Sequence, residues 1–542
     1  MDRSAQSPRG RATALTAVAG LALSALSVGA AMAAPAAAKP PSAKVCDTRA
    51  NVTYQNLLDC VTLAGVREHQ QALQAIADAN GGNRAAGTAG YEASVEYVVQ
   101  TLEAAGWDVS IDEFPYTYVG PSTLRQLSPV TGDYPTGPFT GTGYGEVTAG
   151  VTAVDINLVP PRASTSGCEA ADFAGFPAGN IALIQRGTCP FADKAINAEA
   201  AGASAVVIFN QGNSPDREGL IIGTLGGNDI VDIPVVGGSF ANGVALSQPG
   251  STAYVKVPQP ESRPQKNVLA ELPGENDDNV VMAGAHLDSV PAGPGINDNG
   301  SGSAALLEIA QQIKKLEPVN TIRLAWWGAE ESGLIGSREY VTELSDAEKE
   351  RIALYLNFDM VGSPNYVFMV YDGNQSSWPA PAGIPIPAGS TQIESLFESL
   401  YTKMGQPYDD AQFSGRSDYQ AFILDDIPSG GLFTGAEVVK TAQQASIWGG
   451  TAGQQYDPCY HLACDTYANN SNEALEVNSD VIAAAVLTYA YSTESVNGVV
   501  GEPVPGGWVL PAPAGPQKTV NNPGGGGLSP DHDHDHEPHD LD

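Results

Sequence analysis

Near its middle the 542-residue chain reads Val280-Val281-Met282-Ala283-Gly284-Ala285-His286, an apolar run that ends in a histidine. Similar apolar runs occupy residues 322–327 and 354–358, and a helix-like segment over residues 301–316 separates the first run from the second. Short apolar runs that alternate with helices are typical of strands that are buried on both faces. The pattern predicts an α/β fold with a mixed central sheet flanked by helices.

Polar side chains follow these runs where each strand is expected to end. His286 closes the first run, Glu330 and Glu331 come shortly after the second, and Asp359 follows the third. Ligands of open α/β sheets bind outside the carboxyl ends of the strands, so we expect these side chains to meet. An acid pair is usually solvent-exposed and an isolated histidine is usually structural. The recurrence at three strand ends favours a metal site over both interpretations.

Histidines are scarce in this chain. Four of the seven lie in the last eleven residues, which leaves His69, His286 and His461 for the folded body. Imidazole and carboxylate ligands without thiolates suit zinc or manganese. Two metals roughly 3.5–4 Å apart can share one bridging carboxylate. With one acid bridging, five residues supply three ligands per metal: His286, Asp298, Glu331, Asp359 and His461.

Three further residues near the candidate ligands have side chains suited to acid–base catalysis or hydrogen bonding. Glu330 stands beside a candidate ligand and is the expected general base, which takes a proton from a water shared by the metals. Tyr460 precedes His461 and is the expected hydrogen-bond donor to the oxyanion. Asp288, two residues after His286, is expected to accept the second N–H of that imidazole.

Five motifs occur in order along the second half of the chain. They are residues 285–289 (Ala-His-Leu-Asp-Ser), 295–302 (Gly-Ile-Asn-Asp-Asn-Gly-Ser-Gly), 327–337 (beginning Trp-Gly-Ala-Glu-Glu-Ser-Gly), 357–360 (Asn-Phe-Asp-Met) and 459–465 (Cys-Tyr-His-Leu-Ala-Cys-Asp). Together they resemble the secreted double-zinc aminopeptidases of the streptomycete leucyl aminopeptidase and aminopeptidase Y type. The resemblance implies a zinc-peptidase fold and an enzyme that removes N-terminal residues, preferring large apolar ones such as Leu.

The same resemblance implies how the ligands divide between two zinc ions per chain. His286 and Asp359 would bind one ion, Glu331 and His461 the other, and Asp298 would bridge them, with the catalytic roles as given above. Acids near the metals would receive the substrate ammonium, so peptides need a free N-terminus. Some members of the family also bind calcium, but this chain has no calcium-loop pattern and Ca²⁺ receives no position here.

Residues 414–419 resemble the family segment that lines the substrate pocket. The expected substrate contacts are Met360, Gly415, Arg416 and Phe433. Core packing is the alternative role for Met360 and Phe433, and an ion pair that stabilises a loop is the alternative for Arg416.

The catalytic domain is expected to be interrupted by an inserted module. Residues 83–90 (Asn-Arg-Ala-Ala-Gly-Thr-Ala-Gly) resemble the N-terminal motif of the family, so residues 45–123 are assigned to the peptidase domain with residues 265–500. Between them, residues 124–258 alternate short β-type runs with Gly/Pro turns and resemble a mostly β protease-associated domain. Residues 502–542 form a Pro/Gly-rich linker and an Asp/His tail, which we interpret as a flexible extension.

The chain start and the cysteines indicate export. Residues 1–34 combine a basic start, an Ala-rich apolar run and a small-residue cleavage site, which together form a secretory signal peptide. Six cysteines in a secreted chain suggest disulfides. Their positions form three local couples, Cys46–Cys60, Cys168–Cys189 and Cys459–Cys464. A metal site is the alternative for the last couple.

The net charge of −35 restricts the partners. A surface so poor in Lys and Arg is unsuited to nucleic acid or to anionic membranes. The partners that the resemblance implies are peptides with a free N-terminus, and we expect a monomer. Three alternatives remain open from sequence. They are a glutaminyl cyclase with one zinc, a glutamate carboxypeptidase of the same superfamily, and a metal-binding or adhesion protein that has lost activity.

Overall fold

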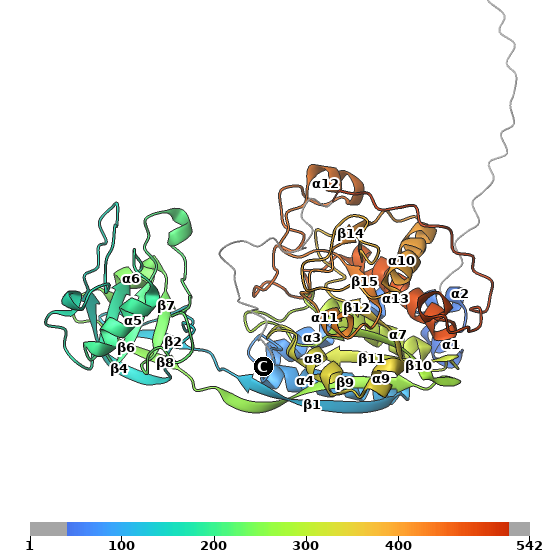
Figure 1. The fold of residues 1–542 in the computed structure, drawn as a ribbon, viewed down its shortest axis with the longest axis horizontal. Coiled ribbons are helices and arrows are strands. Elements are labelled where there is room, and N and C mark those ends of the chain that lie inside the picture. The colour runs from blue at the N-terminus through green and yellow to red at the C-terminus, as the bar shows by residue number, and fades with distance from the viewer. Residues whose placement is uncertain (1–40, 520–542) are drawn as a thin grey trace, which may run out of the picture. The chain divides into compact units, whose positions relative to one another are not determined.

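The structure is a computed structural model that describes residues 41–519, and it contains two β-sheets (Figure 1). The expected signal peptide and the Asp/His end of the tail lie outside the described residues. The larger sheet has eight strands, in the spatial order β1 (Asp108–Tyr118), β9 (Glu261–Leu272), β11 (Asn320–Trp327), β10 (Asn276–His286), β12 (Ile352–Phe358), β15 (Ser429–Phe433), β13 (Met369–Tyr371) and β14 (Asp409–Ala411).

The centre of this sheet is parallel and its borders are mixed. Strands β11, β10, β12 and β15 run parallel, whereas β9 is antiparallel to β11 and β13 is antiparallel to β15. Every residue of β12 is buried, as its apolar sequence predicts for a strand covered on both faces. The expected mixed central sheet is confirmed.

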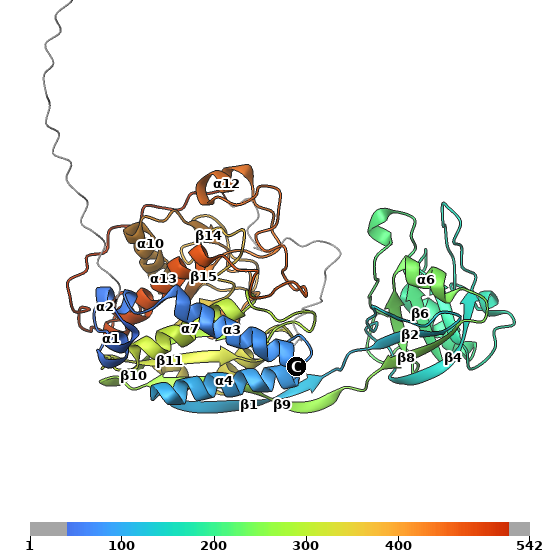
Figure 2. The same cartoon turned by 180° about the vertical axis from the view of Figure 1, so that it is seen from behind.

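Helices cover the sheet on its two faces. Helix α7 (Gly300–Ile313) packs on α4 (Ala89–Ala105) and on α13 (Asn472–Tyr491), and all three contact the sheet. Helices α8 (Ile335–Glu343) and α11 (Tyr419–Leu424) form a second packed group. Figure 2 shows α3 (Leu63–Ala79), α4 and α7 in front of the eight-stranded sheet. The helices of this part are α1 (Ala43–Thr48), α2 (Tyr54–Leu58), α3 (Leu63–Ala79), α4 (Ala89–Ala105), α7 (Gly300–Ile313), α8 (Ile335–Glu343), α9 (Asp346–Arg351), α10 (Ser390–Met404), α11 (Tyr419–Leu424), α12 (Ala442–Trp448), α13 (Asn472–Tyr491) and α14 (Glu494–Asn497).

The second sheet lies between β1 and β9 in the sequence. It has seven strands, in the order β3 (Gly132–Tyr134), β2 (Thr123–Ser128), β8 (Thr252–Val257), β4 (Gly145–Val154), β5 (Ile181–Gln185), β6 (Ala205–Phe209) and β7 (Val235–Gly238). Its helical elements are η1 (Ala170–Phe173), α5 (Phe191–Ala200), η2 (Pro215–Arg217) and α6 (Phe240–Leu246). Successive residues of β5 and β6 enter two different apolar clusters, so both faces of this sheet are buried.

The segment after residue 502 differs from the expectation of a flexible extension. Up to Thr519 it packs against the part of the chain that contains the eight-stranded sheet. The Trp508 ring lies 4.5 Å from the ring of Tyr54, and the Gln517 amide donates to the carbonyl of Tyr408. Thr519 is buried and its amide donates to Asp409 at 2.7 Å. Its Pro/Gly-rich composition predicted flexibility, but these hydrogen bonds fix the backbone without requiring a helix or strand.

Candidate metal centre

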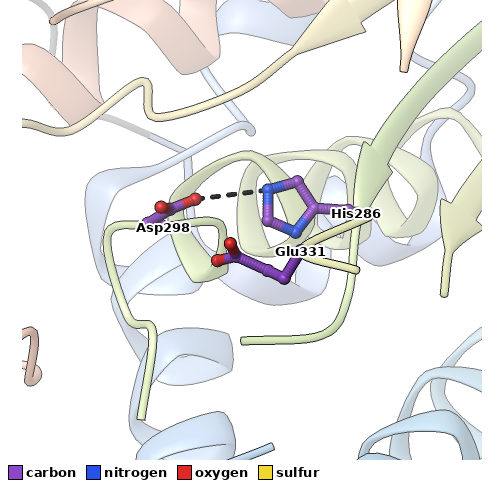
Figure 3. A group of neighbouring side chains, drawn as sticks. All are labelled: His286, Asp298 and Glu331. Carbon is purple, nitrogen blue, oxygen red and sulfur yellow. Dashed lines mark ion pairs between the residues drawn. The ribbon is translucent and has the colours of Figure 1, made fainter. Parts of the chain in front are cut away.

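Five turns and loops bring the predicted ligands together at the carboxyl ends of the parallel strands. His286 is the last residue of β10, Glu330 and Glu331 follow β11, and Asp359 follows β12. Asp298 lies just before α7. Figure 3 shows His286, Asp298 and Glu331 with their polar atoms turned toward one another. We call the six residues His286, Asp298, Glu330, Glu331, Asp359 and His461 the central cluster.

The first half of the central cluster surrounds one imidazole. His286 Nε2 lies 3.2 Å from Asp298 Oδ1, 3.3 Å from Asp359 Oδ1 and 3.8 Å from Glu330 Oε2. Three carboxylates around one buried nitrogen leave more negative charge than a single imidazole can balance.

The second half repeats the arrangement around His461. Its Nε2 lies 3.3 Å from Asp298 Oδ2 and 3.0 Å from Glu331 Oε2. Asp298 therefore presents one oxygen to each imidazole. A carboxylate placed in this way has the geometry of a ligand that bridges two cations.

The donor set fits metal ions. Within the described part of the chain, Glu331 Oε1 and Asp359 Oδ1 are buried and accept no hydrogen bond. A buried carboxylate oxygen without a donor is costly, and a bound cation would satisfy it. Two imidazoles with carboxylates and no thiolate are ligands that zinc accepts.

The pKa shifts of the central cluster also indicate that its carboxylates outnumber the positive charges near them. Burial raises the pKa of Glu331 to about 7, and the nearby Asp298 carboxylate adds to this shift. Burial also raises the pKa of Glu330 well above its usual range. For His461 burial alone lowers the pKa, but hydrogen bonds to Asp298 and Glu331 raise it to about 11.

The backbone near the ligands adopts an uncommon conformation at three non-glycine residues. Ala329, Met360 and His461 have φ angles of 56°, 50° and 56°. His461 belongs to the central cluster, and Ala329 and Met360 each lie next to one of its acids. Left-handed backbone at ordinary residues is rare and occurs preferentially at functional sites.

Asp288 holds the turn that carries the two glutamates. Its carboxylate accepts the backbone N–H of Glu330 at 3.1 Å and of Glu331 at 3.3 Å. His286 Nδ1 lies 3.6 Å from Asp288 Oδ1 but 3.2 Å from the carbonyl oxygen of Asp288. The shorter contact of the imidazole is therefore to the backbone of this residue, and the carboxylate orients the glutamate turn.

Two other residues position ligands, although no role was predicted for them. Asp465 accepts the backbone N–H groups of Asn297 at 2.9 Å and Asp298 at 3.0 Å. The Ser417 hydroxyl donates to Asp359 Oδ2 at 2.7 Å. Both lie within quoted sequence segments, but nothing in the spacing shows which ligand each would touch.

Arg84 was also without a predicted role. Its fully buried guanidinium donates to the carbonyl oxygens of Leu287, Pro294 and Gly295. It therefore ties together the loop that leads from His286 to Asp298. The motif at residues 83–90 contained this residue, but its contacts more than 200 positions away are not visible in sequence.

The predicted oxyanion donor lies beside the second imidazole. The Tyr460 and His461 rings stack with centroids 3.8 Å apart. Burial raises the pKa of Tyr460 well above 10, so its hydroxyl keeps its proton at neutral pH. Arg416 Nη2 donates to that hydroxyl oxygen at 3.2 Å, and Arg416 Nη1 donates to Glu437 at 3.0 Å.

The other expected substrate contacts are placed as follows. Met360 is buried directly after the ligand Asp359, and Phe433 is a half-buried residue at the end of β15. Gly415 has a φ angle of 82°, which favours glycine, and its amide donates to the Tyr419 hydroxyl at 2.8 Å.

His69 lies apart from the donor set. It is buried on α3, where its Nδ1 is 2.6 Å from the Tyr97 hydroxyl. Burial lowers its pKa to about 4.

Three disulfides join the expected pairs. They are Cys46–Cys60, Cys168–Cys189 and Cys459–Cys464. The last one closes a short loop around Tyr460 and His461. The described part of the chain has no helix that is both long and apolar enough to span a membrane.

Comparisons with known proteins agree with this geometry. An aminopeptidase from Pseudomonas aeruginosa is 49% identical over 84% of this chain and 86% of its own length. A probable leucine aminopeptidase 2 from Aspergillus fumigatus is 41% identical over 76% of this chain and 80% of its own. The crystal structure of a zinc aminopeptidase from Bacillus subtilis is similar with a TM-score of 0.56, at 28% identity, over 78% of this chain and 94% of that one.

The sequence matches peptidase family M28 over residues 267–486 and a PA domain over residues 154–246. The resemblance drawn from the five motifs is thereby confirmed. The chain belongs to peptidase family M28 and carries a PA domain inserted in its catalytic domain.

Proposed function

We propose that this protein is a secreted dizinc aminopeptidase that removes the N-terminal residue of peptides and proteins, with a preference for large apolar residues such as Leu. The observation that carries the proposal is the sharing of Asp298 between the His286 and His461 halves of the central cluster. The leucine aminopeptidase name of the fungal relative supports the preference for Leu.

In this proposal His286 and Asp359 hold one zinc ion, Glu331 and His461 hold the other, and Asp298 bridges them. The bound zinc ions would polarise the peptide carbonyl and lower the pKa of water. Asp288, Ser417 and Asp465 keep the ligands in place through the hydrogen bonds described above.

Glu330 acts as the general base, because its carboxylate reaches the cluster without being one of the five ligands. As a carboxylate beside the metals it can take a proton from water and return that proton to the leaving amine. Tyr460 donates its hydroxyl proton to the oxyanion. Because Arg416 donates to the hydroxyl oxygen, the proton of that hydroxyl stays free for the substrate.

The central cluster has more carboxylates than imidazoles, and this excess of negative charge selects substrates with a free N-terminal ammonium. A free N-terminal ammonium is attracted to acids that imidazoles do not balance, whereas an acetylated N-terminus carries no charge. Met360, Gly415, Arg416 and Phe433 remain the proposed contacts of the substrate. Secretion is supported by the signal-like start of the sequence and by three disulfides, and we propose a monomeric enzyme.

The test is hydrolysis of a series of aminoacyl-p-nitroanilides with zinc counted in the same preparation. We expect two zinc ions per chain, rapid cleavage of Leu-p-nitroanilide and none of its N-acetyl derivative. One zinc ion with cyclisation of N-terminal Gln would instead establish a glutaminyl cyclase. Cleavage of N-acetylated dipeptides would establish a carboxypeptidase.

A further inference from the structure

A second group of acids is buried at the other end of the same sheet. Asp372 directly follows β13, Asp410 lies in the edge strand β14, and Glu394 lies on α10. One carboxylate oxygen of each lies within 4.8 Å of the other two. We call Asp372, Glu394 and Asp410 the edge cluster. Their exposed fractions are 2%, 1% and 0%, so water does not screen the charges.

Two oxygens of the edge cluster have no partner. Among the described residues, Glu394 Oε1 and Asp410 Oδ1 are buried and accept no hydrogen bond. Their other oxygens accept from the Asn374 amide and from the Ser377 hydroxyl, respectively. Each carboxylate is thus held through one oxygen, and its other oxygen is buried without a donor.

The third acid is fixed by backbone donors. Asp372 Oδ1 accepts from the Ser376 amide at 2.9 Å, and Oδ2 accepts from the amides of Ser377 and Trp378 at 2.9 and 2.8 Å. These bonds close a tight turn directly after β13. They hold the carboxylate beside the other two acids but bring no positively charged group to the edge cluster.

The charged neighbours increase the imbalance. Burial raises the pKa of Glu394 to about 9, and Glu398, Asp372 and Asp410 add to the shift. Burial raises the pKa of Asp410 to about 7. Within the part of the chain that the structure describes, no Lys, Arg or His forms an ion pair with an acid of the edge cluster.

We infer that Asp372, Glu394 and Asp410 bind one Ca²⁺ ion, at a site separate from the central cluster. Ligands that are all carboxylate oxygens favour a hard cation over zinc. Ca²⁺ accepts several protein oxygens in flexible geometry, whereas Mg²⁺ usually retains several waters and is held by only one or two carboxylates.

The bound ion would fasten the segment that follows β13. Residues 376–378 are attached to Asp372, and Gln412 Nε2 donates to the carbonyl of Pro379 at 2.5 Å. Further along, a Cβ built on Gly415 would lie 2.7 Å from Ile384 Cδ1, so the segment also contacts the loop that carries Arg416. Ca²⁺ would therefore stabilise the wall of the site as well as the sheet edge.

The test uses the full-length enzyme, stripped of metal with a chelator and reloaded with two equivalents of zinc. Calorimetric titration with CaCl₂ should give one Ca²⁺ per chain, and the melting temperature should rise by about 3 °C at a hundredfold excess over Kd. Glu394→Gln and Asp410→Asn should abolish both signals. Glu308→Gln neutralises another buried acid, on α7, and should retain both the calcium binding and the thermal shift.

Several outcomes would overturn the inference. They are no calcium bound by the wild type, an equal thermal shift with MgCl₂, and unchanged calcium binding by both cluster variants. If the variants do not fold, terbium replaces them as the probe of the wild type. Trp378 adjoins Asp372, so Tb³⁺ emission excited through tryptophan should appear, fall with added Ca²⁺ and be lost in Trp378→Phe. Emission that Ca²⁺ does not displace would contradict the site.

Discussion

The central cluster and the edge cluster both gather buried acids on the eight-stranded sheet, yet they differ in one kind of ligand. Two imidazoles stand among the carboxylates of the central cluster, whereas the edge cluster has oxygens alone. The central cluster is also open, since the His461 side chain is 37% exposed. The same sheet can therefore provide a site for a borderline metal that faces substrate and a sealed site for a hard cation.

The largest effect should come from exchanging the two metals. After complete chelation, zinc alone should restore turnover and calcium alone should restore none, because the imidazoles that favour zinc occur only in the central cluster. Calcium added to the zinc-loaded enzyme should then raise the melting temperature without raising turnover at 25 °C. Turnover assays and thermal scans on one preparation check this. If calcium alone restored turnover, the assignment of zinc to the central cluster and calcium to the edge cluster would be wrong.

Glu330→Gln should have the next largest effect. Loss of the general base is expected to lower kcat by about 10²–10⁴-fold, because the glutamine amide cannot accept the proton of water. Zinc content and the calcium-dependent thermal shift should stay as in the wild type. Glu308→Gln is the matched control and should retain near wild-type kcat. A Glu330→Gln enzyme with wild-type kcat would remove this residue from the mechanism.

Two serines allow each cluster to be weakened separately. The Ser417 hydroxyl donates to Asp359 in the central cluster, and the Ser377 hydroxyl donates to Asp410 in the edge cluster. Losing such a supporting bond typically costs about 10–100-fold in metal affinity. Ser417→Ala should weaken zinc alone and Ser377→Ala should weaken calcium alone. Competition with a chromophoric chelator and calcium titration measure the two affinities, and a crossed effect would show that the clusters are coupled.

The smallest effect concerns the buried imidazole outside both clusters. The pKa of His69 is lowered to about 4, against about 6.5 in an unfolded chain. Above pH 6.5 neither state binds the proton. Below it the unfolded state binds the proton first, so the free energy of unfolding falls as pH drops toward 4. Between pH 7 and pH 5 this loss is about 2 kcal/mol.

His69→Gln should lack that part of the pH dependence, since glutamine does not titrate. Urea unfolding of the metal-free wild type and variant at the two pH values measures the difference. Equal losses of stability in both proteins would contradict the assignment of this proton to His69.

The sequence was sufficient to predict that the proposed ligands at strand ends lie together. His286, Glu331 and Asp359 end or follow three adjacent parallel strands, and the topology of such a sheet makes their meeting predictable. Arg84 and Asp465 act through backbone groups that are remote in sequence. Their hydrogen bonds depend on how loops pack, and no local spacing encodes that packing.

The edge cluster was not predictable for the same reason. Asp372, Glu394 and Asp410 are spaced 22 and 16 residues apart, which matches no metal-loop pattern. For the C-terminal segment the sequence predicted too much flexibility. Its Pro/Gly content indicated flexibility up to Thr519, but Asp409 and Tyr408 supply acceptors that hold it.

Strands β1 and β9 pair from Asp108 opposite Glu271 to Tyr118 opposite Glu261. The inserted PA domain thus leaves and re-enters the host sheet at two directly paired residues, as the turn of a hairpin would. Such a junction makes the insertion modular, because a two-residue Asn-Gly turn closes the same pair of strands. The register of β1 and β9 therefore does not depend on residues 119–260, and the two strands would keep their pairing if such a turn replaced the PA domain.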